Sequence, residues 1–269
     1  MKKYHRVLTI ATSDSGGGAG VQADLKTFSA LGCYGMSVFA ALTAQNTSAV
    51  TGIFPIPPAF IAEQIDAVMT DIGVDAVKIG MVYSAEIIDI VAQRLAYYKA
   101  PNIVVDPVMV SKSGSRLLQD EAVEALKTKL LPLAALITPN LPEASVLLGR
   151  PVEKAEDMAA ACGGLAKLGS AAVLLKGGHL AGEKSPDLLY ANGGKLQLTF
   201  EDGRVDTRNT HGTGCTLSSA IAAGLAKGLD LAAAVRAAKD YISAAIRAGA
   251  AYELGKGHGP VHHFYAFWE

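Results

Sequence analysis

Short apolar runs alternate with longer stretches of helical spacing along almost the whole chain. The runs contain β-branched residues and end at glycine, proline or polar residues, which is typical of strands buried on both faces. The predicted strands cover residues 7–11, 36–42, 76–81, 103–109, 136–138 and 172–176. The predicted helices cover residues 19–31, 58–71, 85–98, 120–131, 156–168, 215–227 and 231–250. We therefore expect an α/β fold with three layers, α/β/α, around a mostly parallel central sheet.

Two stretches depart from this alternation. Residues 49–56 form a β-rich segment bounded by glycine and proline, which predicts a hairpin or a flap. Residues 188–200 predict a hairpin that turns at Asn192-Gly193-Gly194. The sequence has no internal repeat and no convincing linker, so we expect residues 1–269 to form a single domain.

Composition excludes several classes of protein. The formal net charge is −1 and 18% of the residues are charged, so no basic surface is available for a nucleic acid or an acidic membrane. No apolar stretch is long enough for a transmembrane helix, and the first residues lack the layout of a signal peptide. The three cysteines are too few and too scattered for a disulfide framework, which favours a reducing cytoplasm. Cys33 and Cys162 lie in helical or turn contexts and are expected in the core.

Several residues that are unusual for their position lie where the predicted strands end. In a parallel sheet the carboxyl ends of the strands form the edge at which ligands bind, so these residues locate a site without naming its chemistry. They are Ser13, Asp14, Gln45, Asn46, Met81, Asp106, Asn140 and Lys176.

The segment Asn209-Thr210-His211-Gly212-Thr213-Gly214-Cys215-Thr216 opens a predicted helix. Glycines at 212 and 214 let the backbone approach a ligand, and the helix start adds a positive dipole end, so Gly212, Thr213 and Gly214 are expected to form an anion hole. A thiol in the first helical turn has a lowered pKa, so Cys215 would accept a proton from a substrate hydroxyl during phosphoryl transfer. The alternative is a small buried cysteine after a glycine turn.

The segment from Ser13 to Gly20 is rich in glycine, but it matches no nucleotide-binding loop. It lacks the Gly-Lys-Ser/Thr of a Walker A loop, and Val21 replaces the third glycine of the dinucleotide fingerprint. Two interpretations remain, namely tight packing between a strand and a helix, or the lining of a substrate pocket.

Four further residues suggest a metal and a phosphate. Asp106 would hold Mg²⁺ directly or through water, and Asn140 and Glu143 would reach the metal or its waters. Their spacing of three residues at a helix start is also that of a capping pair, which spacing alone favours. Lys176 ends a buried strand and is costly there unless it meets a phosphate or an acid.

The C-terminal segment carries His258, His262 and His263, which suggests zinc. No cysteine or acidic residue accompanies these histidines. We therefore favour packing of an aromatic tail through Phe264, Tyr265, Phe267 and Trp268.

Together these residues resemble the ribokinase-like superfamily. Thr210-His211-Gly212-Thr213-Gly214-Cys215 is similar to its anion-hole motif, and cysteine at the last position is typical of hydroxymethylpyrimidine-phosphate kinases and some pyridoxal kinases. The resemblance runs from end to end. It includes residues 13–27, Thr43-Ala44-Gln45-Asn46-Thr47, Lys78-Ile79-Gly80-Met81, residues 105–109, residues 137–144, residues 175–179 and residues 259–264. One departure is Thr12, where these kinases usually have glycine, and it puts in doubt the local packing of the N-terminal loop.

The resemblance implies a ribokinase-like fold, a homodimer, and ATP-dependent phosphorylation of hydroxymethylpyrimidine and then of its monophosphate. It implies that Cys215 faces the hydroxymethyl group and that Gln45 pairs with the polar edge of the pyrimidine. Four residues would line the ring, namely Ala19, Thr43, Met81 and Val108. ATP phosphates would lie near Lys176, Thr210 and the anion hole, with Mg²⁺ held in the region of Asp106, Asn140 and Glu143.

Three alternatives remain. A pyridoxal or pyridoxine kinase shares the cysteine motif, although Gln45 and the complete Thr-His-Gly-Thr-Gly-Cys string favour a pyrimidine. A catalytically silent binding protein would be expected to lack Cys215, Lys176 or the glycines, and none is missing. A nicotinamide-dependent oxidoreductase fits the alternation but lacks the fingerprint.

Overall fold

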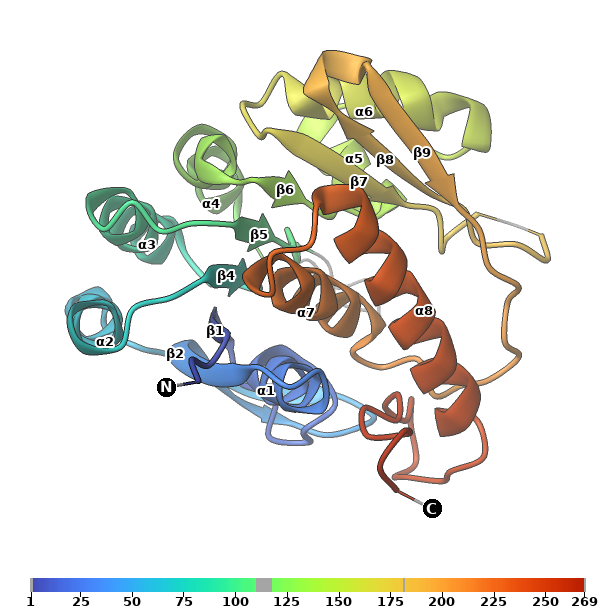
Figure 1. The fold of residues 1–269 in the computed structure, drawn as a ribbon, viewed down its shortest axis with the longest axis horizontal. Helices are drawn as coiled ribbons and strands as arrows, with labels where there is room; N and C mark the ends of the chain where they lie inside the picture. The colour runs from blue at the N-terminus through green and yellow to red at the C-terminus, as the bar shows by residue number, and fades with distance from the viewer. Residues whose placement is uncertain (1, 110–117, 181, 269) are drawn as a thin grey trace.

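The computed structural model describes residues 2–109, 118–180 and 182–268. Nine strands form one sheet (Figure 1), and they are β1 (Arg6–Thr12), β2 (Tyr34–Gln45), β3 (Val50–Pro55), β4 (Ala76–Ile79), β5 (Ile103–Val105), β6 (Leu136–Ile137), β7 (Ala172–Lys176), β8 (Asp187–Ala191) and β9 (Leu196–Phe200). The helices are α1 (Gly20–Ala30), α2 (Pro58–Asp71), α3 (Ala85–Tyr97), α4 (Asp120–Ala125), α5 (Leu141–Leu148), α6 (Met158–Ala166), α7 (Thr213–Ala226) and α8 (Leu231–Gly249).

The sheet order is β3-β2-β1-β4-β5-β6-β7-β8-β9. Strands β2, β1, β4, β5, β6 and β7 are parallel, whereas β3 at one end and β8 and β9 at the other are antiparallel. The mostly parallel sheet and the two predicted hairpins are therefore confirmed. Within residues 120–131, predicted as one helix, α4 is short and a π-helical turn, Leu126–Leu130, continues it.

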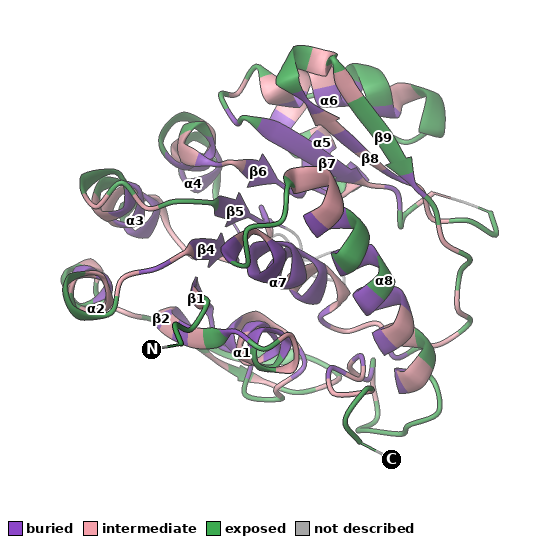
Figure 2. Ribbon diagram, viewed as in Figure 1, coloured by how far each residue is buried: buried purple, intermediate pink, exposed green. Residues whose placement is uncertain are grey.

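Helices cover both faces of the sheet (Figure 1), which confirms the three-layer α/β/α domain. Neighbouring strand residues point to opposite faces, and in β1 Leu8 enters one hydrophobic cluster while Val7 enters the other. The first cluster packs under α2 to α6, and the second packs under α1, α7 and α8. The inward helix faces and the central strands are buried (Figure 2), whereas β3 is exposed along its whole length. None of the helices in the described part of the chain combines the length and hydropathy needed to cross a bilayer.

Strand β1 lies at the point where the sheet changes its direction of growth. The chain first adds β2 on one side of β1 and then adds β4 to β7 on the other side. Loops that follow strands on the two sides of such a point diverge and leave a crevice at the carboxyl edge of the sheet. The loop after β1 and the residues after β4 and β5 lie at this edge, where the sequence predicts the site.

Candidate active site

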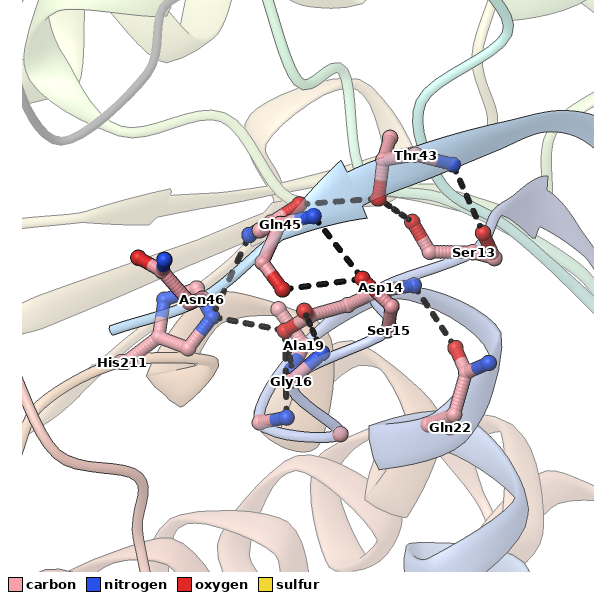
Figure 3. A network of polar contacts seen from close by, with 12 residues as sticks. Ser13, Asp14, Ser15, Gly16, Ala19, Gln22, Thr43, Gln45, Asn46 and His211 are labelled. Atoms are coloured by element: carbon pink, nitrogen blue, oxygen red, sulfur yellow. Dashed lines mark hydrogen bonds and ion pairs between the residues drawn. The ribbon is translucent and has the colours of Figure 1, made fainter. Parts of the chain in front are cut away.

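The loop after β1 closes around the carboxylate of Asp14 (Figure 3). Asp14 Oδ1 accepts the N–H of Gly16 at 2.8 Å, and Oδ2 accepts those of Gly18 at 3.1 Å and Ala19 at 2.8 Å. These amides already bind a carboxylate, so they are not an open cradle for a phosphate. This arrangement supports tight local packing as one role of the glycines, and it fixes Ala19 beside the carboxylate.

A histidine from the other end of the chain meets the same carboxylate. His211 Nε2 lies 2.8 Å from Asp14 Oδ2 and 3.4 Å from Gln45 Nε2. Although burial opposes ionisation of Asp14, hydrogen bonds from His211 and the backbone hold the pKa of its carboxyl below the ordinary value. Gln45 therefore lies next to the imidazole that pairs with an ionised Asp14, and Thr43, also predicted to contact the substrate, lies 3.3 Å from Gln45 Oε1 (Figure 3).

Gly212 forms the turn that starts α7. Its φ is 79°, and a Cβ there would come within 1.8 Å of the Gly18 carbonyl oxygen, so only glycine fits. The turn is thus packed directly against the loop that carries Asp14. One residue into the helix, a Cβ on Gly214 would lie 3.4 Å from Lys176 Nζ and 3.5 Å from Asp106 Oδ2. The start of α7 therefore stands between the Gln45 side and the Lys176 side of the site.

Lys176 meets the acid that its position requires. Its Nζ lies 2.8 Å from Asp106 Oδ1, which also accepts the Thr138 hydroxyl at 3.0 Å. Burial opposes ionisation of Asp106, but the ammonium groups of Lys176 and Lys78 hold its pKa below the ordinary value. The structure thus brings together Lys176, Asp106 and Gly214, which the sequence predicts around the phosphates.

Asn140 and Glu143 form a reciprocal cap on α5. Asn140 Oδ1 accepts the N–H of Glu143 at 2.9 Å, and Glu143 Oε2 accepts the N–H of Asn140 at 2.8 Å. The capping interpretation is confirmed. Burial, and secondarily the charge of Asp106, raise the pKa of Glu143 to about 7. The metal role of these residues stays a prediction.

Cys215 lies in the first turn of α7 and keeps part of its surface exposed. Desolvation by the surrounding protein nevertheless raises the pKa of its thiol above the ordinary value, and the ammonium of Lys78 only partly opposes this. The lowered pKa expected from the helix start is therefore wrong, because burial of the sulfur disfavours its charged form. Cys33 and Cys162 are buried as expected, and no disulfide joins the three cysteines.

Met81 and Val108 follow β4 and β5 at the same edge of the sheet. The Met81 carbonyl accepts both the backbone N–H of Thr12 at 3.1 Å and its hydroxyl at 3.0 Å. Thr12, the departure from the resemblance, thus ties the ends of β1 and β4 together instead of disturbing the loop. Val108 donates its N–H to the Asp106 carbonyl at 2.8 Å, and its contact with a ring stays a prediction.

The C-terminal segment packs against the site. His211 donates its N–H to the Gly259 carbonyl at 3.0 Å, and His258 donates to Thr47 at 2.9 Å. His263 is buried beside the Thr216 hydroxyl, 3.0 Å away, and burial lowers its pKa to about 4. Throughout residues 2–109, 118–180 and 182–268, no three histidine, cysteine or carboxylate side chains gather to hold a metal ion. The structure shows packing in this segment, where His263 is buried and Phe264 stacks on Trp268.

The sheet order, the switch point at β1 and the glycine turn that opens α7 are those of a kinase of the ribokinase-like class. Residues 14–262 match the family described as phosphomethylpyrimidine kinase. The hydroxymethylpyrimidine/phosphomethylpyrimidine kinase of Rhizobium meliloti is 52% identical over 263 residues, 97% of this chain and 98% of the relative. The chain belongs to the phosphomethylpyrimidine kinase family. A thiamine biosynthesis bifunctional protein of Geobacter sulfurreducens is 54% identical over 260 residues, and the chain spans 52% of that relative's length.

The solved structures that resemble this chain include a member of this family and a pyridoxal kinase. A phosphomethylpyrimidine kinase of Clostridium difficile superposes with a TM-score of 0.80 at 47% identity, covering 90% of this chain and 99% of that chain. An ADP complex of Bacillus subtilis pyridoxal kinase superposes with a TM-score of 0.90 at 40% identity, covering 98% of this chain and 99% of that chain. The fold alone therefore does not separate pyrimidine from pyridoxal kinases, and the ring-contacting residues must do so.

Sequence reasoning assigned no role to His211, Asp14 or Lys78. Asp14 and His211 are 197 residues apart, and nothing in their local pattern predicts their contact. Lys78 was detectable, because it interrupts a predicted buried strand as Lys176 does. Its partner is Asp24, 2.9 Å away, on the inner face of α1.

Proposed function

We propose that this chain catalyses the ATP-dependent phosphorylation of 4-amino-5-hydroxymethyl-2-methylpyrimidine and of its monophosphate, for thiamine biosynthesis. Relatives that are about half identical over nearly the whole chain carry this activity in their names. The observation that carries the proposal is the position of the Gly212–Cys215 turn. It packs against the loop beside Gln45 on one side and faces Lys176 and Asp106 on the other. One turn thus joins a ring-reading group to a phosphate-binding group.

In the first reaction the hydroxymethyl oxygen attacks the γ-phosphorus of ATP, and the bond from that phosphorus to the bridging oxygen of ADP breaks. Cys215 takes the hydroxyl proton onto its sulfur in the thiolate form. Because burial raises the pKa of the thiol, the ammonium of Lys78 is the group that favours this form. Backbone N–H groups of the α7 start stabilise the charge on the transferred phosphoryl group, because they point outward at the positive end of the helix dipole. Lys176 is already paired with Asp106 and would shift its ammonium toward the ATP phosphates. Thr210 would lie beside the same phosphates.

Mg²⁺ is part of this proposal, and the donors fit it. The Asp106 carboxylate, the Asn140 amide and the Glu143 carboxyl offer hard oxygen atoms, which are the ligands that Mg²⁺ prefers. Because Asn140 and Glu143 already cap α5, they would hold the ion through water molecules. When bound, Mg²⁺ neutralises charge on the ATP phosphates.

A pyridoxal kinase is the second candidate, favoured by the TM-score of 0.90 to the Bacillus subtilis enzyme. Side-by-side assays of ATP consumption with hydroxymethylpyrimidine, its monophosphate and pyridoxine separate the two functions. We expect the largest kcat/KM with a pyrimidine, since a hydrogen-bonding site rejects rings that leave its polar groups unpaired. A clearly larger kcat/KM with pyridoxine would replace the pyrimidine function by the pyridoxal one.

We also propose that the chain works as a homodimer in the cytoplasm. Apolar side chains are exposed on one end of the sheet and the start of α2, namely Leu42, Val50, Ile53, Phe54 and Phe60. A second copy covering them would remove this apolar surface from water. Light scattering after size exclusion tests the dimer, and Phe54→Ser should shift the species toward the monomer. The free thiols support a reducing compartment.

A further inference from the structure

The amide of Gln45 lies between two groups that limit which of its atoms faces which partner (Figure 3). The Oε1 position lies 3.3 Å from the Thr43 hydroxyl, and the Nε2 position lies 3.4 Å from His211 Nε2. Amide oxygen and nitrogen are nearly the same size, so the hydrogen-bonding character of the neighbours decides which atom occupies which position.

His211 presents a donor to this amide. Its Nε2 lies 2.8 Å from Asp14 Oδ2, and the Asp14 carboxylate also accepts three backbone N–H groups, from Gly16, Gly18 and Ala19. These four contacts keep Asp14 ionised, and an ionised carboxylate has no proton to give. The proton between Asp14 and His211 therefore sits on His211 Nε2. This single N–H is directed mainly at Asp14 Oδ2, 2.8 Å away, and Gln45, at 3.4 Å, can only share it as a second, weaker acceptor. A protonated Nε2 has no lone pair, so it cannot accept an N–H from Gln45.

Thr43 presents an acceptor to the other end of the amide. A hydroxyl has one proton, and Thr43 Oγ1 lies 2.8 Å from the Ser13 carbonyl oxygen but 3.3 Å from Gln45. A carbonyl oxygen only accepts, so the hydroxyl proton points to Ser13. A lone pair of Thr43 Oγ1 is left for Gln45, and it requires an N–H. The two neighbours thus demand the same arrangement of the amide.

We infer that Gln45 Oε1 accepts the Nε2–H of His211 while Gln45 Nε2 donates to Thr43 Oγ1, and that the Asp14–His211 pair is the positioning device that fixes this orientation. The amide oxygen then occupies the position next to His211, and the amide nitrogen occupies the position next to Thr43. With one site of each kind occupied, Gln45 keeps one N–H and one oxygen lone pair for a ligand. His211 and Asp14 determine what Gln45 offers without needing to touch the ring.

The free N–H and the free oxygen lone pair of Gln45 would select the ring of the substrate. This use of them rests on the proposed function. A 4-aminopyrimidine carries a ring nitrogen that accepts next to an amino group that donates, so its edge pairs with both groups of Gln45. The ring nitrogen of pyridoxine has a methyl-bearing carbon on one side and a C–H on the other. Pyridoxine therefore satisfies only one of the two groups and leaves the other unpaired, which costs affinity.

The first test needs no substrate. A long-range ¹H–¹⁵N correlation spectrum of the ¹⁵N-labelled, ligand-free chain distinguishes a protonated ring nitrogen from a bare one. We expect a protonated Nε2 on His211, whose signals are identified by their absence in His211→Asn. A bare Nε2 would accept an N–H from the Gln45 amide. Gln45 would then have the opposite orientation, and the inference would be overturned.

The second test is calorimetric binding of hydroxymethylpyrimidine without ATP. His211→Asn cannot place an N–H at the Nε2 position, whereas His211→Gln can, so the two form a matched pair. We expect His211→Asn to weaken binding roughly 5- to 150-fold, the range for an unpaired buried polar group, and His211→Gln to recover most of the loss. In a Gln45→Ala background the two substitutions should differ by less than about two-fold, because their effect passes through Gln45.

Equal losses from His211→Asn with and without Gln45 would overturn the positioning role. ADP binding measured on the same variants reports damage to the adjoining anion-hole turn. If the unmodified chain binds no pyrimidine, the proposed function fails, while the ring-nitrogen spectrum still decides the orientation of Gln45.

Discussion

Lys78 Nζ lies 2.9 Å from Asp24 Oδ2 in the interior, where neither side chain has any exposed surface. Thr9 donates to the same oxygen at 2.6 Å, and Ser219 donates to Asp24 Oδ1 at 2.7 Å. Ser219 follows Cys215 by four residues in α7, so both side chains lie on one face of the helix. The buried ion pair is therefore about one helical turn from the sulfur proposed to take the substrate proton.

Replacing Lys78 by methionine should lower the free energy of unfolding by about 3–5 kcal/mol, because Asp24 is left as an unpaired buried charge. Urea unfolding followed by circular dichroism measures this loss. The double variant Lys78→Met/Asp24→Asn removes both charges and should recover a substantial part. No recovery would mean that packing around the lysine stem, not charge, stabilises this region.

The same pair should tune the Cys215 thiol in opposite directions. The Lys78 ammonium opposes the burial that raises the Cys215 pKa, whereas Asp24 and Asp106 add to it. Lys78→Met should therefore raise the pKa of Cys215 further, and Asp24→Asn should lower it. The pH dependence of alkylation at Cys215, resolved by mass spectrometry from Cys33 and Cys162, reports both shifts. Shifts of the same sign in both variants would contradict this electrostatic account.

Removing the thiol should affect the two phosphorylations unequally. A hydroxymethyl group must lose a proton as it attacks, whereas a phosphate monoester is mostly deprotonated at pH 7 because its second pKa is about 6. Cys215→Ala should thus lower kcat for the first reaction by roughly 10²–10⁴-fold and lower kcat for the second far less. Cys215→Asp, which keeps a base at this position, should retain more activity in the first reaction. A folded alanine variant with full kcat in both reactions would leave Cys215 as a packing residue.

Gln45→Ala should weaken binding of the pyrimidine more than binding of ATP. Losing hydrogen bonds to a buried ring costs about 1–3 kcal/mol, while the contacts of Lys176 and the α7 start are untouched. The two apparent KM values, measured with the other substrate saturating, report the difference. Equal rises in both KM values would show that Gln45 does not read the ring.

His263 should make the fold sensitive to mild acid. Burial, together with the charges of Lys26 and His262, lowers its pKa to about 4 from an ordinary value of 6.5. The unfolded chain binds this proton first, so the associated stability is complete above pH 6.5 and is lost as pH falls toward 4. Wild-type unfolding free energy should fall by about 2–3 kcal/mol over this interval, and by less in His263→Gln. Parallel pH profiles for the two proteins would refute this origin.

Sequence patterns predicted the parallel sheet and its edge well, because period and strand-end polarity are local properties. The expectation that Lys176 meets a phosphate or an acid is fulfilled by Asp106, since a buried ammonium needs a negatively charged partner. The predicted lowering of the Cys215 thiol pKa is wrong, because the desolvation of the sulfur depends on everything that surrounds it and not on the helix start alone. The spacing of Asn140 and Glu143 is compatible both with capping a helix and with binding a metal. The structure establishes the cap.

The contacts that orient Gln45 lay beyond sequence reasoning for a different reason. Asp14 and His211 meet only because α7 returns to the loop after β1, and no periodicity encodes that return. Buried charges in predicted strands and helices, such as Lys78 and Asp24, do give a signal, namely that each must have a partner. Which partner each finds is decided by tertiary packing.

The hydrogen bond from His211 to the Gly259 carbonyl has a consequence for synthesis on the ribosome. The chain emerges from its N-terminus, so the loop that holds Asp14 leaves the exit tunnel long before residues 211 and 259 do. Until those residues emerge, the Asp14 carboxylate has no imidazole beside it and the Gln45 amide is free to rotate. A nascent chain can thus build much of its sheet before residues 211 and 259 complete the contacts around Asp14 and Gln45.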